Sequence, residues 1–257
     1  MPAERFALTG AQQRRLILLR GQQDRCRRWP SLLKECRMRD AICQSRRPAH
    51  PHGNAQVTSV LGSLRRATKE RHRALEALDT LSMPLRLDRY LQALRGFEML
   101  LSRWEPRVLL ALPERLHVWL ASRSRYALAR SDLEHLDCRP ATDVDLLELC
   151  SAHVRRIDLA SVAAAFGSLY VLEGSCLGGQ VIAQAAHEAV DIGARGATYF
   201  TGSGSATASH WREFLALLDA EIANDAASHA AASNAAQQTF DALIGIFTAL
   251  RNAPAAR

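Results

Sequence analysis

The feature of this 257-residue chain that most limits its possible folds is an almost uncharged stretch, residues 159–187. Glu173 is its only formal charge, and glycine, serine and glutamine residues lie close to that charge. A carboxylate at the centre of a bilayer costs about 2.5 to 3.5 kcal/mol even on a mild insertion scale. The stretch therefore predicts a helix buried in a protein core, and we expect no membrane span.

The composition favours helices throughout. Hydrophobic residues make up 48% of the chain, which is enough to bury one good-sized core, whereas aromatic residues make up only 6%. Alanine and leucine are abundant, and no run of alternating β-branched residues interrupts them. These features predict an all-α, single-domain bundle of six or seven helices, and they exclude a disulfide miniprotein, a collagen and a disordered polyelectrolyte.

Apolar residues at three- and four-residue intervals predict the individual helices. The expected ranges are 61–78, 87–101, 116–128, a helix that starts at 143–149, then 159–190, 211–222 and 226–250. Asp158 is the expected N-cap of the long apolar helix, and Pro106 and Pro113 are expected to break the chain after the second helix. Four glycines between residues 193 and 204 predict a loop that contains Tyr199 and Phe200.

The net charge of +7 belongs to the first part of the chain. Residues 1–57 carry 12 basic and 4 acidic side chains, whereas residues 58–257 carry 21 and 22. We expect a basic, poorly ordered extension at 1–57, a helical domain at 58–250 and a short tail at 251–257. A basic arm can bind nucleic acid or anionic lipid, but the balanced charge of the domain predicts no nucleic-acid partner for it.

Cysteine use and the start of the chain point to a reducing compartment. Six cysteines are present without any CxxC pair, which predicts neither a zinc site nor a disulfide framework. The apolar run at 16–19 is too short for a secretory signal and is followed by Arg20. We therefore expect a cytoplasmic protein with reduced cysteines. Cys176 is predicted to be a small buried hydrophobe, and Trp211, Phe214 and Phe240 to be core residues.

One candidate site is the segment LRRATKERHRALE, residues 64–76. On a helix, Arg65 and His72 lie two turns or about 10.5 Å apart on one side, and Glu76 follows His72 by one turn. A neutral imidazole is a good iron or zinc ligand when a carboxylate holds its other ring nitrogen. The same pattern also fits an ordinary surface pair, because one histidine does not hold zinc without companions.

A second candidate is LYVLEGSCLGGQVI, residues 169–182. Each of its three glycines costs about 0.8 to 1 kcal/mol relative to alanine inside a helix, so something should compensate for them. Gly174 and Gly178 share a face that admits a flat ligand or another backbone. Tight packing between helices is the alternative explanation, and the flanking Glu173 and Ser175 favour the ligand surface.

Together, in this order and about 100 residues apart, the two segments resemble the biliverdin-forming heme oxygenases, most closely the bacterial branch associated with bacteriophytochromes. The resemblance covers residues 58–250. The first segment is similar to the family's proximal helix and the second to its distal helix. The resemblance implies that His72 is the ligand to heme iron, that Glu76 holds the other imidazole nitrogen, and that Arg65 pairs with a heme propionate.

On the distal side, the resemblance implies that Gly174 and Gly178 bring backbone almost against the porphyrin and that Gly179 extends this surface. Ser175 stands where many members of the family carry an aspartate that organises distal water. A hydroxyl can donate to water or accept from it, so proton delivery through Ser175, backbone groups and solvent is expected.

The implied reaction takes heme b as both substrate and cofactor and cleaves its ring with dioxygen and an external electron donor, such as ferredoxin or a reductase. The expected products are biliverdin, carbon monoxide and iron. A bacteriophytochrome is the implied bilin acceptor, and the enzyme is expected to be a monomer. Two other interpretations stay open from the sequence. One is a heme carrier or sensor without catalysis, and the other is a non-heme helical enzyme or scaffold on a similar bundle.

Overall fold

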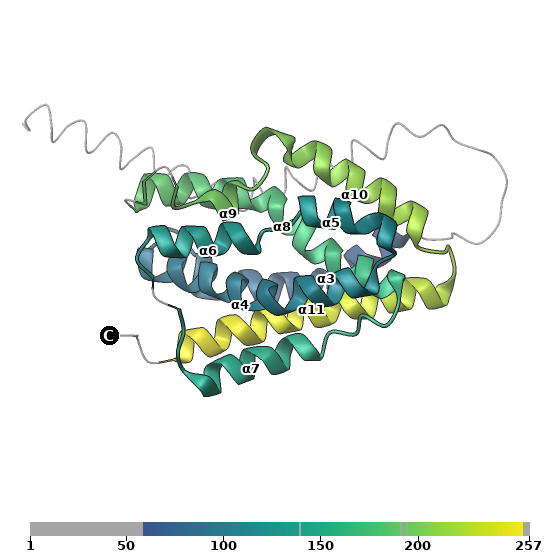
Figure 1. Ribbon diagram of the computed structural model, residues 1–257, viewed down its shortest axis with the longest axis horizontal. Helices are drawn as coiled ribbons and strands as arrows, with labels where there is room; N and C mark the ends of the chain where they lie inside the picture. The colour runs from purple at the N-terminus through teal and green to yellow at the C-terminus, as the bar shows by residue number, and fades with distance from the viewer. Residues whose placement is uncertain (1–58, 139, 191, 194, 254–257) are drawn as a thin grey trace, which may run out of the picture. The chain divides into compact units, whose positions relative to one another are not determined.

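The computed structural model describes residues 59–253 except 139, 191 and 194, and this part of the chain is helical with no strand (Figure 1). The prediction of an all-α fold is therefore confirmed for the described residues. The predicted extension at 1–57 and the last four residues of the predicted tail lie outside them.

The helices agree with most of the predicted ranges. They are α3 (Val60–Glu76), α4 (Leu87–Ala111), α5 (His117–Ser122), α6 (Tyr126–His135), α7 (Val144–Arg155), α8 (Val162–Ala189), α9 (Thr198–Thr201), α10 (Thr207–Glu221) and α11 (Ala226–Asn252). Short 3₁₀ turns occur at η1 (Asp79–Leu81), η2 (Glu114–Leu116) and η3 (Gly204–Ala206). Side chains of Ser59, Asp143, Ser161 and Asp225 accept backbone N–H groups at the starts of α3, α7, α8 and α11.

Two predictions about helix ends are wrong. The N-cap of α8 is Ser161, because the Asp158 carboxylate accepts instead from the backbone N–H of Ala160, at 2.9 Å, in the preceding turn. Pro106 does not end the second helix, since α4 continues through it to Ala111. Proline removes one backbone hydrogen bond, but buried Trp104 and Val108 hold both sides of the helix in the core.

The predicted helix at 116–128 is also wrong, because the chain breaks between α5 and α6. Glu105 of α4 explains the break. Its Oε1 atom accepts from the backbone N–H groups of Arg125 and Tyr126, at 3.0 and 3.2 Å, and its Oε2 atom accepts from the Ser124 hydroxyl at 2.7 Å. A carboxylate at a helix start satisfies free N–H groups and the helix dipole, so a residue from another helix sets where α6 begins.

The predicted glycine loop contains a short helix, α9, that the sequence pattern did not indicate. Asp132 of α6 is fully buried and accepts from the backbone N–H groups of Thr198 and Tyr199, at 3.0 and 2.8 Å. Figure 1 shows α6 and α9 side by side at one end of the domain. Tyr199 and Phe200 are therefore drawn into the core, where both are buried.

The core is built around α11, which packs against α3, α4, α7 and α8 and lies along α4 and α7 in Figure 1. Helices α8 and α11 approach so closely that a Cβ atom on Gly167 would lie 1.9 Å from the carbonyl oxygen of Ala232. In the buried layer between them, the Ser168 and Thr239 hydroxyls are 2.6 Å apart, and the indole N–H of Trp104 donates to Ser168 at 2.7 Å.

By length and composition alone, α8 passes as a membrane span, but 56% of its most apolar window is buried inside the protein. That burial is what the sequence predicted for a core helix.

Candidate functional site

His72 lies near the end of α3 with 44% of its side chain exposed. Its Nδ1 atom is buried and lies 3.2 Å from Oε1 of Glu76, which is within ion-pair distance but outside hydrogen-bond geometry. The edge of the ring packs on Phe240 of α11, with ring centroids 5.7 Å apart. The Nδ1 side of the imidazole therefore faces Glu76 of α3 and Phe240 of α11, but the hydrogen bond that the sequence predicted from Glu76 is not formed here.

The other ring nitrogen of His72, Nε2, has no hydrogen-bond partner in the described part of the chain. When Nδ1 carries the proton toward a carboxylate, the lone pair of Nε2 is available to a metal. The described residues contain no group of three His, Cys, Asp or Glu side chains that could hold a metal ion. Arg65 lies on the same helix two turns earlier and is partly buried.

The three glycines of the second predicted segment, Gly174, Gly178 and Gly179, face different surroundings on α8. A Cβ atom on Gly178 would meet nothing within 4 Å, and one on Gly174 would meet only the Trp211 ring of α10, at 3.9 Å. A Cβ atom on Gly179 would lie 2.6 Å from the carbonyl oxygen of Phe200 in α9. Gly179 is therefore required for packing between α8 and α9, which was the alternative explanation for these glycines. Gly174 and Gly178 have no such requirement and leave a strip of backbone uncovered.

Ser175, next to Gly174, donates one hydrogen bond and accepts another through its hydroxyl group. Its hydroxyl donates to the carbonyl oxygen of Leu172 at 2.7 Å and accepts from NH2 of Arg125 at 3.0 Å. The same NH2 group donates to the Leu172 carbonyl at 2.9 Å. The sequence left open whether this hydroxyl donates or accepts, and here its one proton is already used within α8.

Glu173 is a buried carboxylate, 9% exposed, whose ion pair with Arg123 is long at 3.6 Å. Arg123 also pairs with Glu213 of α10 and lies over the Trp119 ring, 5.5 Å from its centroid. Burial raises the pKa of the Glu173 carboxyl, and the guanidinium groups of Arg123 and Arg125 oppose that rise. Burial likewise raises the pKa of the Cys176 thiol, although Cys176 is partly exposed and is not the fully buried small hydrophobe that the sequence predicted.

The two predicted constellations adjoin the same two helices, since α10 and α11 each pack against both α3 and α8. His72 contacts Phe240 of α11, and Gly174 lies beside Trp211 of α10. The buried Nδ1 of His72 and the buried indole N–H of Trp211 both lack a hydrogen-bond partner among the described residues. Such groups are rare in folded proteins and are often completed by a ligand, ion or water.

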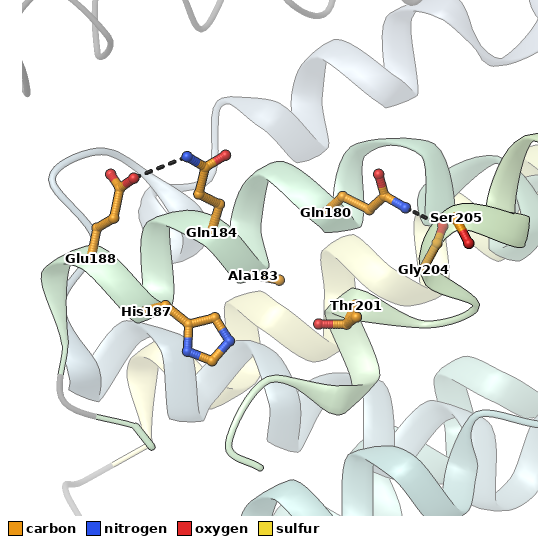
Figure 2. Close-up of a pocket in the computed structure, with 8 residues that line it drawn as sticks. All are labelled: Gln180, Ala183, Gln184, His187, Glu188, Thr201, Gly204 and Ser205. Atoms are coloured by element: carbon orange, nitrogen blue, oxygen red, sulfur yellow. Dashed lines mark hydrogen bonds between the residues drawn. The ribbon is translucent and has the colours of Figure 1, made fainter. Parts of the chain in front are cut away.

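Two cavities lie elsewhere on α8. One, of about 620 Å³, lies between the C-terminal half of α8 and the segment from α9 to η3 (Figure 2). In Figure 2, Gln180 reaches across to Gly204, and His187 points toward Thr201. The other, of about 350 Å³, lies between α4, the turn from α5 to α6, and α8, with Glu173 and Arg125 in its wall. None of the seven predicted site residues lines either of these two cavities.

Sequence reasoning missed Arg125 and the role of Tyr199. The guanidinium of Arg125 lies over the Tyr199 ring, 4.7 Å from its centroid. Arg125 was hidden inside the wrongly predicted helix at 116–128, and Tyr199 was recognised only as an apolar residue in a loop. The contact joins two segments about 75 residues apart, and no local pattern marks it.

Comparisons with known proteins show the family and the fold of this chain. The heme oxygenase family model matches residues 58–249. The structure of heme oxygenase from Leptospira interrogans superposes with a TM-score of 0.59 at 18% sequence identity, over 74% of this chain and 99% of that chain. At this identity the likeness shows the shared fold. None of the curated proteins matches the chain.

Proposed function

The chain belongs to the heme oxygenase family, and from this premise we propose that it degrades heme to biliverdin, carbon monoxide and iron. The observation that carries the proposal is the setting of His72. Its Nδ1 atom faces Glu76, its ring is steadied by Phe240, and its Nε2 atom is free to coordinate iron. A porphyrin supplies four iron ligands of its own, so a single protein histidine is sufficient.

The residues present fit heme on both sides. On α3, His72 would hold the iron, Glu76 would orient the imidazole, and Arg65 would pair with a propionate through its planar fork. On α8, Gly174 and Gly178 expose backbone that a flat ligand can approach within contact distance. Bound heme supplies the iron that activates dioxygen and is itself the molecule that becomes oxidised.

The protein's own contribution is to position the heme and to limit the space around it. His72 would hold the iron, Arg65 would hold a propionate and so orient the heme, and the backbone of α8 would restrict the space beside it. Ser175 lies at this backbone with its hydroxyl held by Arg125 and Leu172. Gly179 supports the surface indirectly, because it allows α8 to pack on α9.

The proposal extends to partners that the family requires. Dioxygen and an external electron donor, such as ferredoxin or a reductase, are co-substrates, and a bacteriophytochrome of the associated branch is the proposed bilin acceptor. We propose that the enzyme acts as a monomer in the cytoplasm, with free thiols. Cys138, Cys150 and Cys176, the cysteines that the structure describes, carry no disulfide.

Purified protein mixed with hemin, then supplied with a reductant under air, tests this function. The proposal expects a Soret band on hemin binding, then its loss with the rise of bilin absorption and release of carbon monoxide. A stable Soret band under these conditions would identify a heme carrier or sensor, the alternative that shares His72 and Arg65. Absence of hemin binding would point to a non-heme protein on the same fold.

A further inference from the structure

Arg125 reaches α8 from the turn between α5 and α6, and three sets of contacts hold it in place. Its backbone N–H donates to Glu105 of α4 at 3.0 Å. Its guanidinium lies over the ring of Tyr199, a residue that is 1% exposed. Its NH2 group donates to the Leu172 carbonyl and the Ser175 hydroxyl. Arg125 is therefore anchored by α4, α8 and α9 together.

These contacts determine what Ser175 can offer a ligand. A serine hydroxyl has one proton and two lone pairs. The proton goes to the Leu172 carbonyl, because a carbonyl oxygen only accepts, and one lone pair receives the Arg125 N–H, because a guanidinium only donates. A single acceptor position remains on Ser175, and it lies next to a permanent positive charge.

We propose that Arg125 is a positioning residue that holds the Ser175 hydroxyl as a hydrogen-bond acceptor toward the distal face of the heme site. This inference rests on the proposed function. Water bound there would donate one hydrogen bond to Ser175 and direct its other O–H toward the heme face. A proton given up by this water would be replaced from bulk solvent, while the serine proton stays on the Leu172 carbonyl. Without Arg125 the hydroxyl is free to rotate, and the water loses its fixed orientation.

The test compares Arg125→Met, Ser175→Ala and the double variant with Arg125→Lys, which keeps the charge. Arg130→Met is the matched control, since Arg130 lies on the exposed face of α6 paired with Glu134. We expect Arg125→Met and Ser175→Ala each to lower the rate of bilin formation about tenfold. The double variant should lose no more than the Ser175→Ala variant, because Arg125 acts through Ser175. Arg125→Lys should recover part of the rate, and Arg130→Met should match the unsubstituted protein.

The reduction potential of the bound hemin provides a readout independent of turnover. A nearby positive charge destabilises oxidised iron more than reduced iron. Arg125→Met removes that charge, so the midpoint potential should shift to more negative values. Ser175→Ala, Arg125→Lys and Arg130→Met should leave it near its original value. Thermal unfolding of each variant checks the fold, and if Arg125→Met does not fold, Arg125→Lys combined with Ser175→Ala replaces the double variant.

Additive losses in the double variant, or an unchanged midpoint potential in Arg125→Met, would overturn the positioning role. If the unsubstituted protein binds hemin without forming bilin, the proposed function fails, and an unchanged midpoint potential in Arg125→Met would separately show that Arg125 lies too far from the heme for the positioning role. If it binds no hemin, both proposals are wrong.

Discussion

Helices α3 and α8 carry the two halves of the candidate site in opposite ways. On α3 the chemistry lies in side chains that remain partly or fully exposed, such as His72 and Glu76. On α8 it lies in missing side chains, since Gly174 and Gly178 expose backbone just after the buried N-terminal half of the helix. A functional side chain can be recognised by its type, whereas a functional glycine must be distinguished from a packing glycine by its surroundings.

The largest expected effect is on α3. His72→Ala removes the only proposed protein ligand to iron, so bilin formation should fall about a thousandfold, or about 4 kcal/mol. The ring is half exposed and touches the core only at Phe240, so the free energy of unfolding should change by less than about 1 kcal/mol. Soret spectra of the hemin complex test the ligation, with exposed His187→Ala as control. An unchanged Soret band in His72→Ala would remove His72 from the site.

The next effect separates packing glycines from functional ones on α8. Gly167→Ala would place a Cβ atom 1.9 Å from the Ala232 carbonyl oxygen, and backbone cannot move aside as a flexible side chain can. The variant should lose about 2 to 3 kcal/mol of unfolding free energy in urea denaturation of the heme-free protein. A neutral result would mean that α8 and α11 are not in such close contact.

Gly178→Ala should have the opposite sign in the heme-free protein. Its Cβ atom meets nothing within 4 Å, so the higher helix propensity of alanine should stabilise the fold by about 0.8 to 1 kcal/mol. With heme present the added methyl occupies the proposed contact surface, and bilin formation should fall at least about tenfold. Stabilisation together with normal bilin formation would contradict the proposal that backbone at Gly178 approaches the ring.

The smallest expected effect concerns Glu173, where burial raises the pKa of the carboxyl. A raised pKa means that the folded protein binds the proton more tightly than the unfolded chain, so stability decreases as pH rises through that pKa. Glu173→Gln removes this dependence. The variant should gain unfolding free energy relative to the original protein at pH 8, and the gain should shrink as pH falls toward 4. A gain that does not depend on pH would show that Glu173 does not titrate differently in the two states.

Much of this architecture could be predicted because hydrophobic periodicity and capping residues act locally. The helical class, the positions of α3, α7 and α11, and the burial of α8 follow from patterns within one segment. The pair of His72 and Glu76 also follows, because residues four apart on a helix are neighbours wherever the helix lies. The resemblance to heme oxygenases rests on two such segments, and the family model now covers both.

The remaining features depend on contacts between distant segments. The break at Arg125 is set by Glu105 of α4, and α9 is started by Asp132 of α6. Three glycines that look equivalent in the sequence differ in their surroundings. Gly179 packs against the backbone of Phe200, whereas open space lies beside Gly178. Residue types and local spacing therefore determined which groups are available. The packing of helices determined which of those groups face a ligand, because burial and hydrogen-bond partners come from other parts of the chain.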